Sequence, residues 1–209
     1  MLGYEFILHI EGETVRNDDV YLQIYLIRHA ESMGNIETDE SFDIMNPPLT
    51  QHGRMQAEAL AKRMSDIKLD AVYSSPLERA VSTALPISSA CGASVRFEPL
   101  LREKDVCLTF KGFSFNPETE SECAERAKEF FGMLKDKHKN GRIAVVSHGE
   151  FLQFLLREIM GISDSDIRFC FYNASVSKIN LRENKPGKVA FQNDISHLQL
   201  IDGDKTDWM

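Results

Sequence analysis

The sequence has few cysteines, and their spacing matches no metal-binding or disulfide motif. The 209 residues contain only Cys91, Cys107, Cys123 and Cys170, widely scattered along the chain. No pair has C-x-x-C spacing, and no histidine lies at a distance typical of a zinc ligand. We therefore expect free thiols in a reducing compartment, with no metal or other cofactor.

Long apolar runs are also absent. No stretch of about 18 consecutive apolar residues occurs, which argues against a membrane-spanning helix. The first residues, MLGYEFILHIEGE, lack the basic start and the long apolar core of a signal peptide. These two absences predict a cytoplasmic protein.

Positive charge is in deficit. The chain carries 24 Lys and Arg against 32 Asp and Glu, a net charge of −8. Nucleic acids and anionic membranes require a basic face, so neither is expected as the main partner. A small anionic substrate is compatible with this balance, because a few arginines can create a local positive field inside an acidic protein.

No internal repeat, low-complexity tract or Pro/Gly-rich linker divides the chain, which predicts one domain over residues 1–209. Two stretches rich in β-branched and aromatic residues come first, YEFILHI (4–10) and VYLQIYLI (20–27). They are typical of two strands joined as a hairpin. Residues 1–19 would then add one N-terminal strand and turn, which could form a homodimer contact or cap the sheet.

Strands and helices are expected to alternate along the rest of the chain. Strands are predicted at 69–75, 94–99, 142–148, 175–181 and 188–193, the last two around a turn at 184–187. Helices are predicted from the N-cap Thr50 to residue 64, from the N-cap Ser75 to 92, over 117–141 and over 149–161. This alternation indicates an α/β three-layer sandwich, with a mostly parallel central sheet and helices on both faces.

Chemically active side chains follow several of these strands. Arg28 and His29 come after the strand at 20–27, and His148 ends the strand at 142–148. Arg79 lies on the helix after 69–75, and Glu103 follows 94–99 after a short connection. Sheets of this kind bind ligands at the carboxyl ends of their strands, so we expect all five side chains at one edge.

Two arginines, two histidines and a carboxylate fit phosphoryl transfer without a metal. Arginines bind phosphate oxygens bidentately, and a neutral imidazole can attack phosphorus. A carboxylic acid of raised pKa can protonate the leaving oxygen. Each residue alone has a simpler explanation: Arg28 beside His29 could be a surface feature, and His29 with His148 could bind zinc. Their joint placement favours phosphoryl chemistry.

The sequence also resembles the histidine phosphatase superfamily, in its phosphoglycerate-mutase-like branch. LIRHAESMGN (26–35) is similar to that family's Arg-His-Gly-Glu-Ser/Thr signature, which is followed by Asn. The similarity continues in order through 47–57, 72–84, 99–105, 144–156, 173–181 and 193–198. It covers about residues 22–200.

The resemblance implies a role for each matching residue. His29 would be the nucleophile that accepts the phosphoryl group, and Glu103 the general acid. Arg28 and Arg79 would hold the phosphate, and His148 would stabilise the transferring group. The remaining matches are Asn35, expected near the phosphate or the nucleophile, Ser32 and Gly149, expected to line the pocket, and Gln56 and Ser75, for which helix packing and capping are equally expected.

Three departures from the family pattern bear on function. Ala30 replaces the usual glycine after the histidine, the Gly-x-Trp-Glu-Gly pattern after the acid is missing, and the interval from Glu103 to His148 is short. That interval has room for little more than one helix, so we expect an open pocket. An open pocket favours a hydrolase over a mutase, because a mutase must keep water from its intermediate.

The intact set of five active side chains also favours an enzyme over a non-catalytic relative that only binds phosphate. We expect a small phosphorylated metabolite as the substrate, with a phosphoprotein as the alternative.

Overall fold

The structure, a computed structural model, describes residues 20–36, 41–106, 108–110, 112–163, 166–183 and 185–202. The strand predicted at 4–10, and the hairpin that it would form with 20–27, lie outside these residues. Both stay predictions, as does the assignment of residues 1–209 to one domain. Among the described residues, no helix combines the length and the apolar character needed to cross a bilayer.

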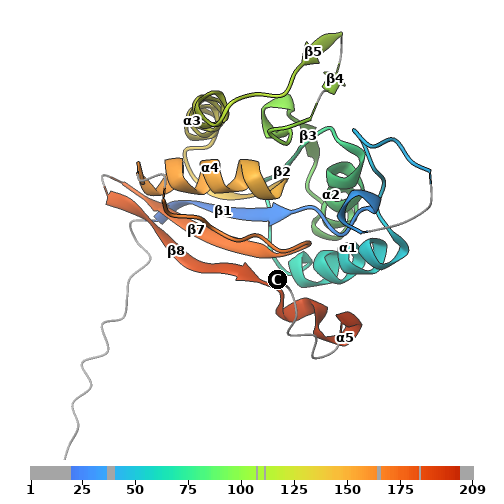
Figure 1. Cartoon of the computed structure of the whole chain (residues 1–209). Coiled ribbons are helices and arrows are strands. Elements are labelled where there is room, and N and C mark those ends of the chain that lie inside the picture. Colours follow the sequence, from blue (N-terminus) through green and yellow to red (C-terminus); the bar gives the residue numbers. More distant parts are fainter. Residues whose placement is uncertain are drawn as a thin grey trace, which may run out of the picture.

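A six-stranded sheet forms the centre of the molecule (Figure 1). Its strands are β1 (Val20–Arg28), β2 (Ala71–Ser74), β3 (Val95–Phe97), β6 (Gly141–Ser147), β7 (Val176–Arg182) and β8 (Lys185–Asp194). They are ordered β3-β2-β6-β1-β7-β8, and the first four run parallel. β7 pairs antiparallel with both β1 and β8, so the mostly parallel sheet is confirmed with one reversed strand.

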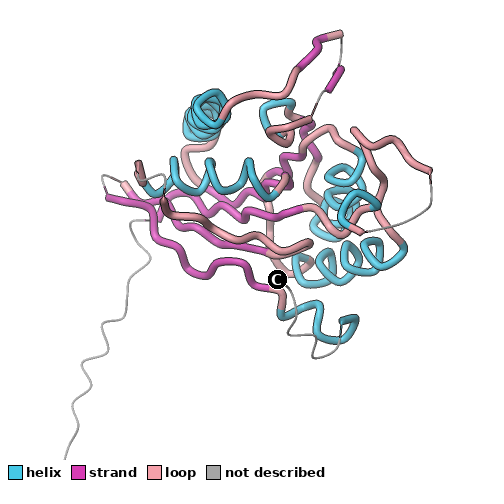
Figure 2. Tube along the Cα trace, viewed as in Figure 1, coloured by secondary structure: helices cyan, strands magenta, loops and turns pink. Residues whose placement is uncertain are grey.

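Helices cover both faces of the sheet, as the sequence predicts (Figures 1 and 2). They are α1 (Gln51–Met64), α2 (Glu78–Cys91), α3 (Glu120–Lys137), α4 (Gly149–Met160) and the short α5 (Gln199–Asp202). Short 3-10 turns add η1 (Met33–Asn35), η2 (Pro99–Leu101) and η3 (Ser196–Leu198). α1 and α2 pack on one face of the sheet, and α3 and α4 pack on the other.

The alternation of side chains along β1 explains the two cores. Successive residues of a strand point to opposite faces of the sheet. Ile24 and Leu26 therefore pack with the apolar faces of α3 and α4, whereas Tyr25 and Ile27 pack with α1 and α2. β1 is buried on both sides, which fixes the loop that follows Arg28 at the middle of the sheet edge.

The structure corrects the predicted start of the second helix. Ser75 was expected to be its N-cap, but α2 begins at Glu78 with Leu77 at the cap position. The Ser75 hydroxyl accepts a hydrogen bond from the Leu77 amide at 3.3 Å and also contacts Nε2 of His148 at 2.9 Å. Ser75 therefore joins the turn before α2 to the edge of β6.

Two further differences concern short elements. β4 (Leu108–Phe110) and β5 (Phe113–Phe115) form a small antiparallel hairpin, where the sequence suggested little more than a helix after Glu103. Figure 1 shows this hairpin projecting beyond the sheet. The turn predicted at 184–187 is also shorter than expected, because β8 already begins at Lys185.

Candidate active site

The register of the sheet brings the ends of β1, β6 and β2 together. Arg28 pairs with Ser147, so His29 and His148 leave neighbouring strands side by side. The ring centroids of the two histidines lie 5.1 Å apart. Ser74 pairs with Val146 on the other side of β6, which places the turn leading into α2 at the same edge.

His29 is held as a neutral base. It is 3% exposed, and its Nδ1 lies 2.8 Å from the Ala30 carbonyl oxygen. A carbonyl only accepts, so Nδ1 carries the proton and the lone pair is on Nε2. Burial lowers the pKa of His29 well below its usual value, and the charges of Arg79 and Arg28 lower it further. The free Nε2 lone pair is what attack on phosphorus requires.

The backbone of this histidine is fixed by neighbouring segments. Its amide donates to the Ser147 carbonyl at 2.9 Å, and its own carbonyl accepts from the Asn173 side chain at 3.0 Å. The next amide, that of Ala30, donates to the Thr83 hydroxyl at 3.0 Å. These bonds tie the loop after β1 to β6, to α2 and to the segment before β7.

Buried nitrogen donors with no hydrogen-bond partner among the described residues surround His29. They are Nε of Arg28, Nη1 of Arg79 and Nδ1 of His148. Arg79 and His148 are 6% and 0% exposed, and unsatisfied buried donors are costly. When Ser75 donates to Nε2 of His148, Nδ1 of that ring carries a proton and becomes a donor. Together the three donors suit an anion with several oxygens.

Glu103 completes the group. Its Oε1 accepts from the amides of Lys104 at 3.0 Å and Phe151 at 3.2 Å. Burial raises the pKa of Glu103, while the two amide hydrogen bonds and the charge of Arg79 oppose the rise. Glu103 and Arg28 line the same pocket. Burial lowers the pKa of Arg28 and Arg79, and the charge of Glu103 opposes this fall at both arginines. A carboxyl of raised pKa suits proton donation.

Asn35 and Ser32 stabilise the loop that follows β1 by hydrogen bonds to each other. The Asn35 side-chain oxygen accepts from the Ser32 amide at 3.0 Å and from the Ser32 hydroxyl at 2.9 Å. The Asn173 side chain reaches the same oxygen at 3.3 Å. Ser32 is 1% exposed, so it has little surface to offer a substrate. Both residues support the loop that follows β1 from the side of Asn173.

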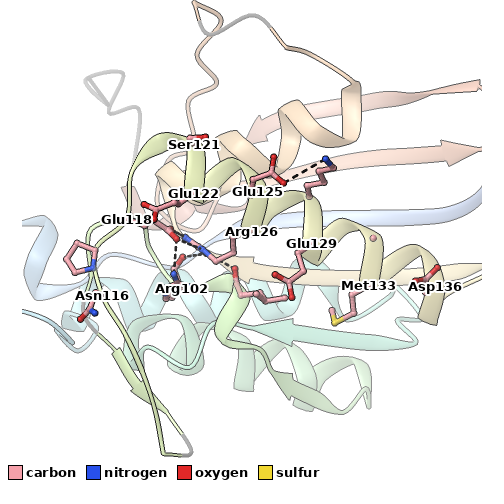
Figure 3. Close-up of a pocket in the computed structure, with 14 residues that line it drawn as sticks. Arg102, Asn116, Glu118, Ser121, Glu122, Glu125, Arg126, Glu129, Met133 and Asp136 are labelled. Carbon is pink, nitrogen blue, oxygen red and sulfur yellow. Dashed lines mark hydrogen bonds and ion pairs between the residues drawn. The ribbon is translucent and has the colours of Figure 1, made fainter.

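Gly149 lines a pocket of about 510 Å³ beside the strand ends. Its walls include Arg28, Glu103, Gln153 and Tyr172. A larger hollow of about 930 Å³ runs along α3 and has none of the predicted site residues in its lining (Figure 3). Of these two, the smaller pocket is the one with predicted site residues in its lining, namely Arg28, Glu103 and Gly149.

The structure bears on two questions that the sequence raised, the departure at Ala30 and the role of Gln56. Ala30 does not adopt a positive φ, so the missing glycine causes no backbone strain at that position. Gln56 accepts the Glu31 amide at 2.9 Å through its side-chain oxygen and thereby supports the loop from α1. This contact favours a structural role for Gln56 over a role in substrate binding.

Gly53 in α1 approaches the same loop so closely that a side chain does not fit. A Cβ at this position would overlap the main-chain carbonyl of Glu31. We expect Gly53→Ala to lower the free energy of unfolding by about 3 kcal/mol, the upper end for overpacking, because backbone must move. Urea denaturation would measure this loss.

Gly132 in α3 offers a matched control. An added Cβ there meets no atom of the described part of the chain within 4 Å, and alanine favours a helix over glycine. Gly132→Ala should therefore leave stability unchanged or raise it by up to about 1 kcal/mol. Similar unfolding curves for the two variants would contradict the close approach of α1 to the loop.

Sequence reasoning missed several residues that hold the site. Asn173 lies in a stretch similar to the family but received no role, and Thr83 was part of a helix without a specific one. Thr83 follows Arg79 by four residues, so both lie on the same helix face, which is a signal that was available.

Comparisons with known proteins agree with this geometry. The family profile described as "Histidine phosphatase superfamily (branch 1)" matches residues 24–116 and 108–194. A Schizosaccharomyces pombe protein named "Probable phosphatase C1620.13" is 32% identical over 182 residues, covering 77% of this chain and 64% of that protein. The Erwinia tasmaniensis protein named "Probable phosphoglycerate mutase GpmB" is 28% identical over 206 residues, covering 85% and 95%.

Solved structures show the same fold. The α-ribazole phosphatase from Shigella flexneri superposes with a TM-score of 0.69 at 24% identity, covering 82% of this chain and 96% of that one. The family profile extends over most of the chain and includes the five predicted active side chains, those of Arg28, His29, Arg79, Glu103 and His148. The chain belongs to the histidine phosphatase superfamily, in its branch 1.

Proposed function

We propose that the protein is a metal-independent phosphomonoester hydrolase that forms a phosphohistidine on His29. Glu103 acts first as the general acid and then as the general base. The observation that carries this proposal is the set of buried donors on Arg28, Arg79 and His148, which have no partner among the described residues, around a neutral His29. A phosphate group would satisfy all three donors at once.

In the first step, Nε2 of His29 attacks phosphorus and a P–N bond forms. The bond from phosphorus to the ester oxygen breaks, and Glu103 gives its proton to the departing alkoxide. Arg28, Arg79 and His148 stabilise the negative charge that spreads over the equatorial oxygens in the transition state. The alcohol leaves, and Glu103 remains as a carboxylate.

In the second step, a water molecule attacks the phosphohistidine. Glu103 takes a proton from this water, the P–N bond breaks, and inorganic phosphate leaves. His29 regains its Nε2 lone pair and Glu103 regains its proton, so the enzyme returns to its starting state. The net reaction converts a phosphomonoester and water to an alcohol and phosphate.

The role of Glu103 is testable through the leaving group. Glu103→Gln should lower kcat/KM on an alkyl phosphate by about 100-fold, because a poor leaving group needs a proton. On 4-nitrophenyl phosphate, whose leaving group is stable as an anion, the loss should be far smaller. Initial rates on the two substrates measure the difference.

Asp105→Asn is the matched control for this experiment. Asp105 is a nearby carboxylate with a 66% exposed side chain that pairs with Lys104 at 2.9 Å. Its substitution should change neither the rates nor their ratio appreciably. Equal losses on both substrates for Glu103→Gln would remove Glu103 from the acid role.

We infer that the substrate is a small phosphorylated metabolite. The pocket of about 510 Å³ has a size typical of small-molecule sites, and it includes aromatic and amide side chains beside Arg28. The name of the GpmB relative also refers to a small phosphorylated acid. Phosphate release from a panel of metabolites and phosphopeptides would decide between the two substrate classes.

A mutase is the second candidate, because one relative is named as a probable phosphoglycerate mutase. A mutase would pass the phosphoryl group from His29 to a second hydroxyl before water could react. Incubation with 3-phosphoglycerate, followed by assays for both 2-phosphoglycerate and free phosphate, distinguishes the two reactions. Isomerisation that outpaces phosphate release would replace the hydrolase with the mutase.

A further inference from the structure

The three main-chain carbonyls directly before Glu103 accept hydrogen bonds from side chains of other elements. Nη1 of Arg126 donates to the Leu100 carbonyl at 2.6 Å and to the Arg102 carbonyl at 2.9 Å. Between them, the Leu101 carbonyl accepts from the Ser147 hydroxyl at 2.7 Å. Three successive carbonyls thus have buried donors, directly before the proposed general acid.

Arg126 belongs to a buried ionic cluster with Arg102 and Glu118, drawn in Figure 3. Nε of Arg126 donates to Oε2 of Glu118 at 3.0 Å, and a second Arg126 nitrogen contacts Oε1. Arg102 reaches Glu118 at 2.8 Å. The backbone amide of Glu118 donates to the Lys104 carbonyl at 3.3 Å, so the cluster holds the chain on both sides of Glu103.

The cluster also contacts Phe151, whose amide binds the Glu103 carboxyl group. The Arg126 guanidinium lies over the Phe151 ring, with Cζ 4.4 Å from the centroid. The Phe151 amide is one of the two that donate to Oε1 of Glu103. Arg126 therefore contacts the residue that binds the carboxylate as well as the segment that carries it.

Burying these charged groups costs free energy, and a contribution to stability does not by itself explain why the cluster is present. Two arginines and one glutamate are almost fully buried here, with side chains 9%, 5% and 7% exposed. Apolar side chains of similar volume often stabilise a core as well as a buried ion pair does. What apolar side chains cannot do is hold a set of carbonyls at defined positions.

We propose that Arg126, together with the Ser147 hydroxyl, is a positioning residue for Glu103. It fixes segment 100–104 so that the carboxyl meets the leaving oxygen in the first step and water in the second. The inference rests on the proposed function, because it concerns the acid and base role of Glu103. Neither residue is required to touch the substrate.

Arg126→Met and Ser147→Ala test the proposal through the ratio of activity on an alkyl phosphate to activity on 4-nitrophenyl phosphate. This ratio does not depend on how much of the protein is folded. A displaced acid should reduce the ratio about 10- to 100-fold for Arg126→Met, and less for Ser147→Ala. In a Glu103→Gln background, neither substitution should reduce the ratio further, because coupled residues are non-additive.

Arg63→Met is the matched control. Arg63 pairs with Asp194 at 2.5 Å, with a side chain that is 19% exposed, in α1 on the opposite face of the sheet. Its loss removes a comparable ion pair and should leave the ratio unchanged. If Arg126→Met fails to fold, Arg126→Lys and Ser147→Ala decide in its place.

An unchanged ratio in the folded Arg126 and Ser147 variants would overturn the positioning role, whatever happens to their stability. Failure of the proposed function looks different. In that case, Glu103→Gln itself would not change the ratio, or the unmodified protein would release no phosphate from any ester.

Discussion

His29→Ala should abolish turnover and phosphoenzyme formation together. Removal of a covalent nucleophile typically lowers kcat by a factor on the order of 10⁴ to 10⁶. The arginines would still bind phosphate, so the substitution should affect kcat much more than KM. Stopped reactions with ³²P-labelled substrate would measure the adduct, which should be labile in acid and stable in base because phosphorus is bonded to nitrogen.

His138→Ala is the control for this variant. His138 lies at the C-terminal end of α3, where its Nε2 contacts the Tyr73 hydroxyl at 2.9 Å. Activity per folded molecule should be unchanged. Full activity of His29→Ala, or loss of activity of the unmodified protein in a chelator, would each contradict the phosphohistidine mechanism.

Arg79→Ala should lower kcat/KM by a factor on the order of 10³ to 10⁵, the effect typical of an arginine that stabilises a transferring phosphoryl group. The pH dependence should change as well. Burial is the largest cause of the lowered pKa of both His29 and His148, and the charge of Arg79 lowers both further, so removal of that charge raises both pKa values. More His29 is then protonated at a given pH, and activity on the acid side should be lost at a higher pH.

Arg79→Lys separates the two effects. Lysine keeps the positive charge but cannot form the bidentate contact. The rate should therefore fall, while the acid side of the pH–rate profile stays close to that of the unmodified protein. A profile of Arg79→Ala that does not move would show that Arg79 has no influence on the nucleophile.

The elements of the fold were predictable because their signals are local. The buried run that forms β1, the Thr50 cap and the glycine after α4 each depend on neighbouring residues. The rule that ligands bind at the carboxyl ends of strands then placed Arg28, His29 and His148 together without any coordinates.

The errors occurred where tertiary contacts outweigh local preference. Ser75 is a good capping residue by type, but its hydroxyl contacts His148, which is 73 positions later in the chain. The three-residue strands β4 and β5 are too short for periodicity to indicate. Arg126 could not be linked to Glu103, because a positive charge on an amphipathic helix is usually exposed.

The position of β1 in the sheet has a consequence for protein synthesis. β1 leads into the loop with His29, yet its hydrogen-bonded neighbours are β6 and β7, which come more than 110 residues later in the sequence. A nascent or truncated chain that stops before Gly141 contains Arg28, His29 and Arg79 but lacks both of these neighbours of β1. Pairing of such distant segments comes late in folding. Phosphoryl transfer should therefore appear only once translation has passed β7, and prematurely terminated products should be inactive.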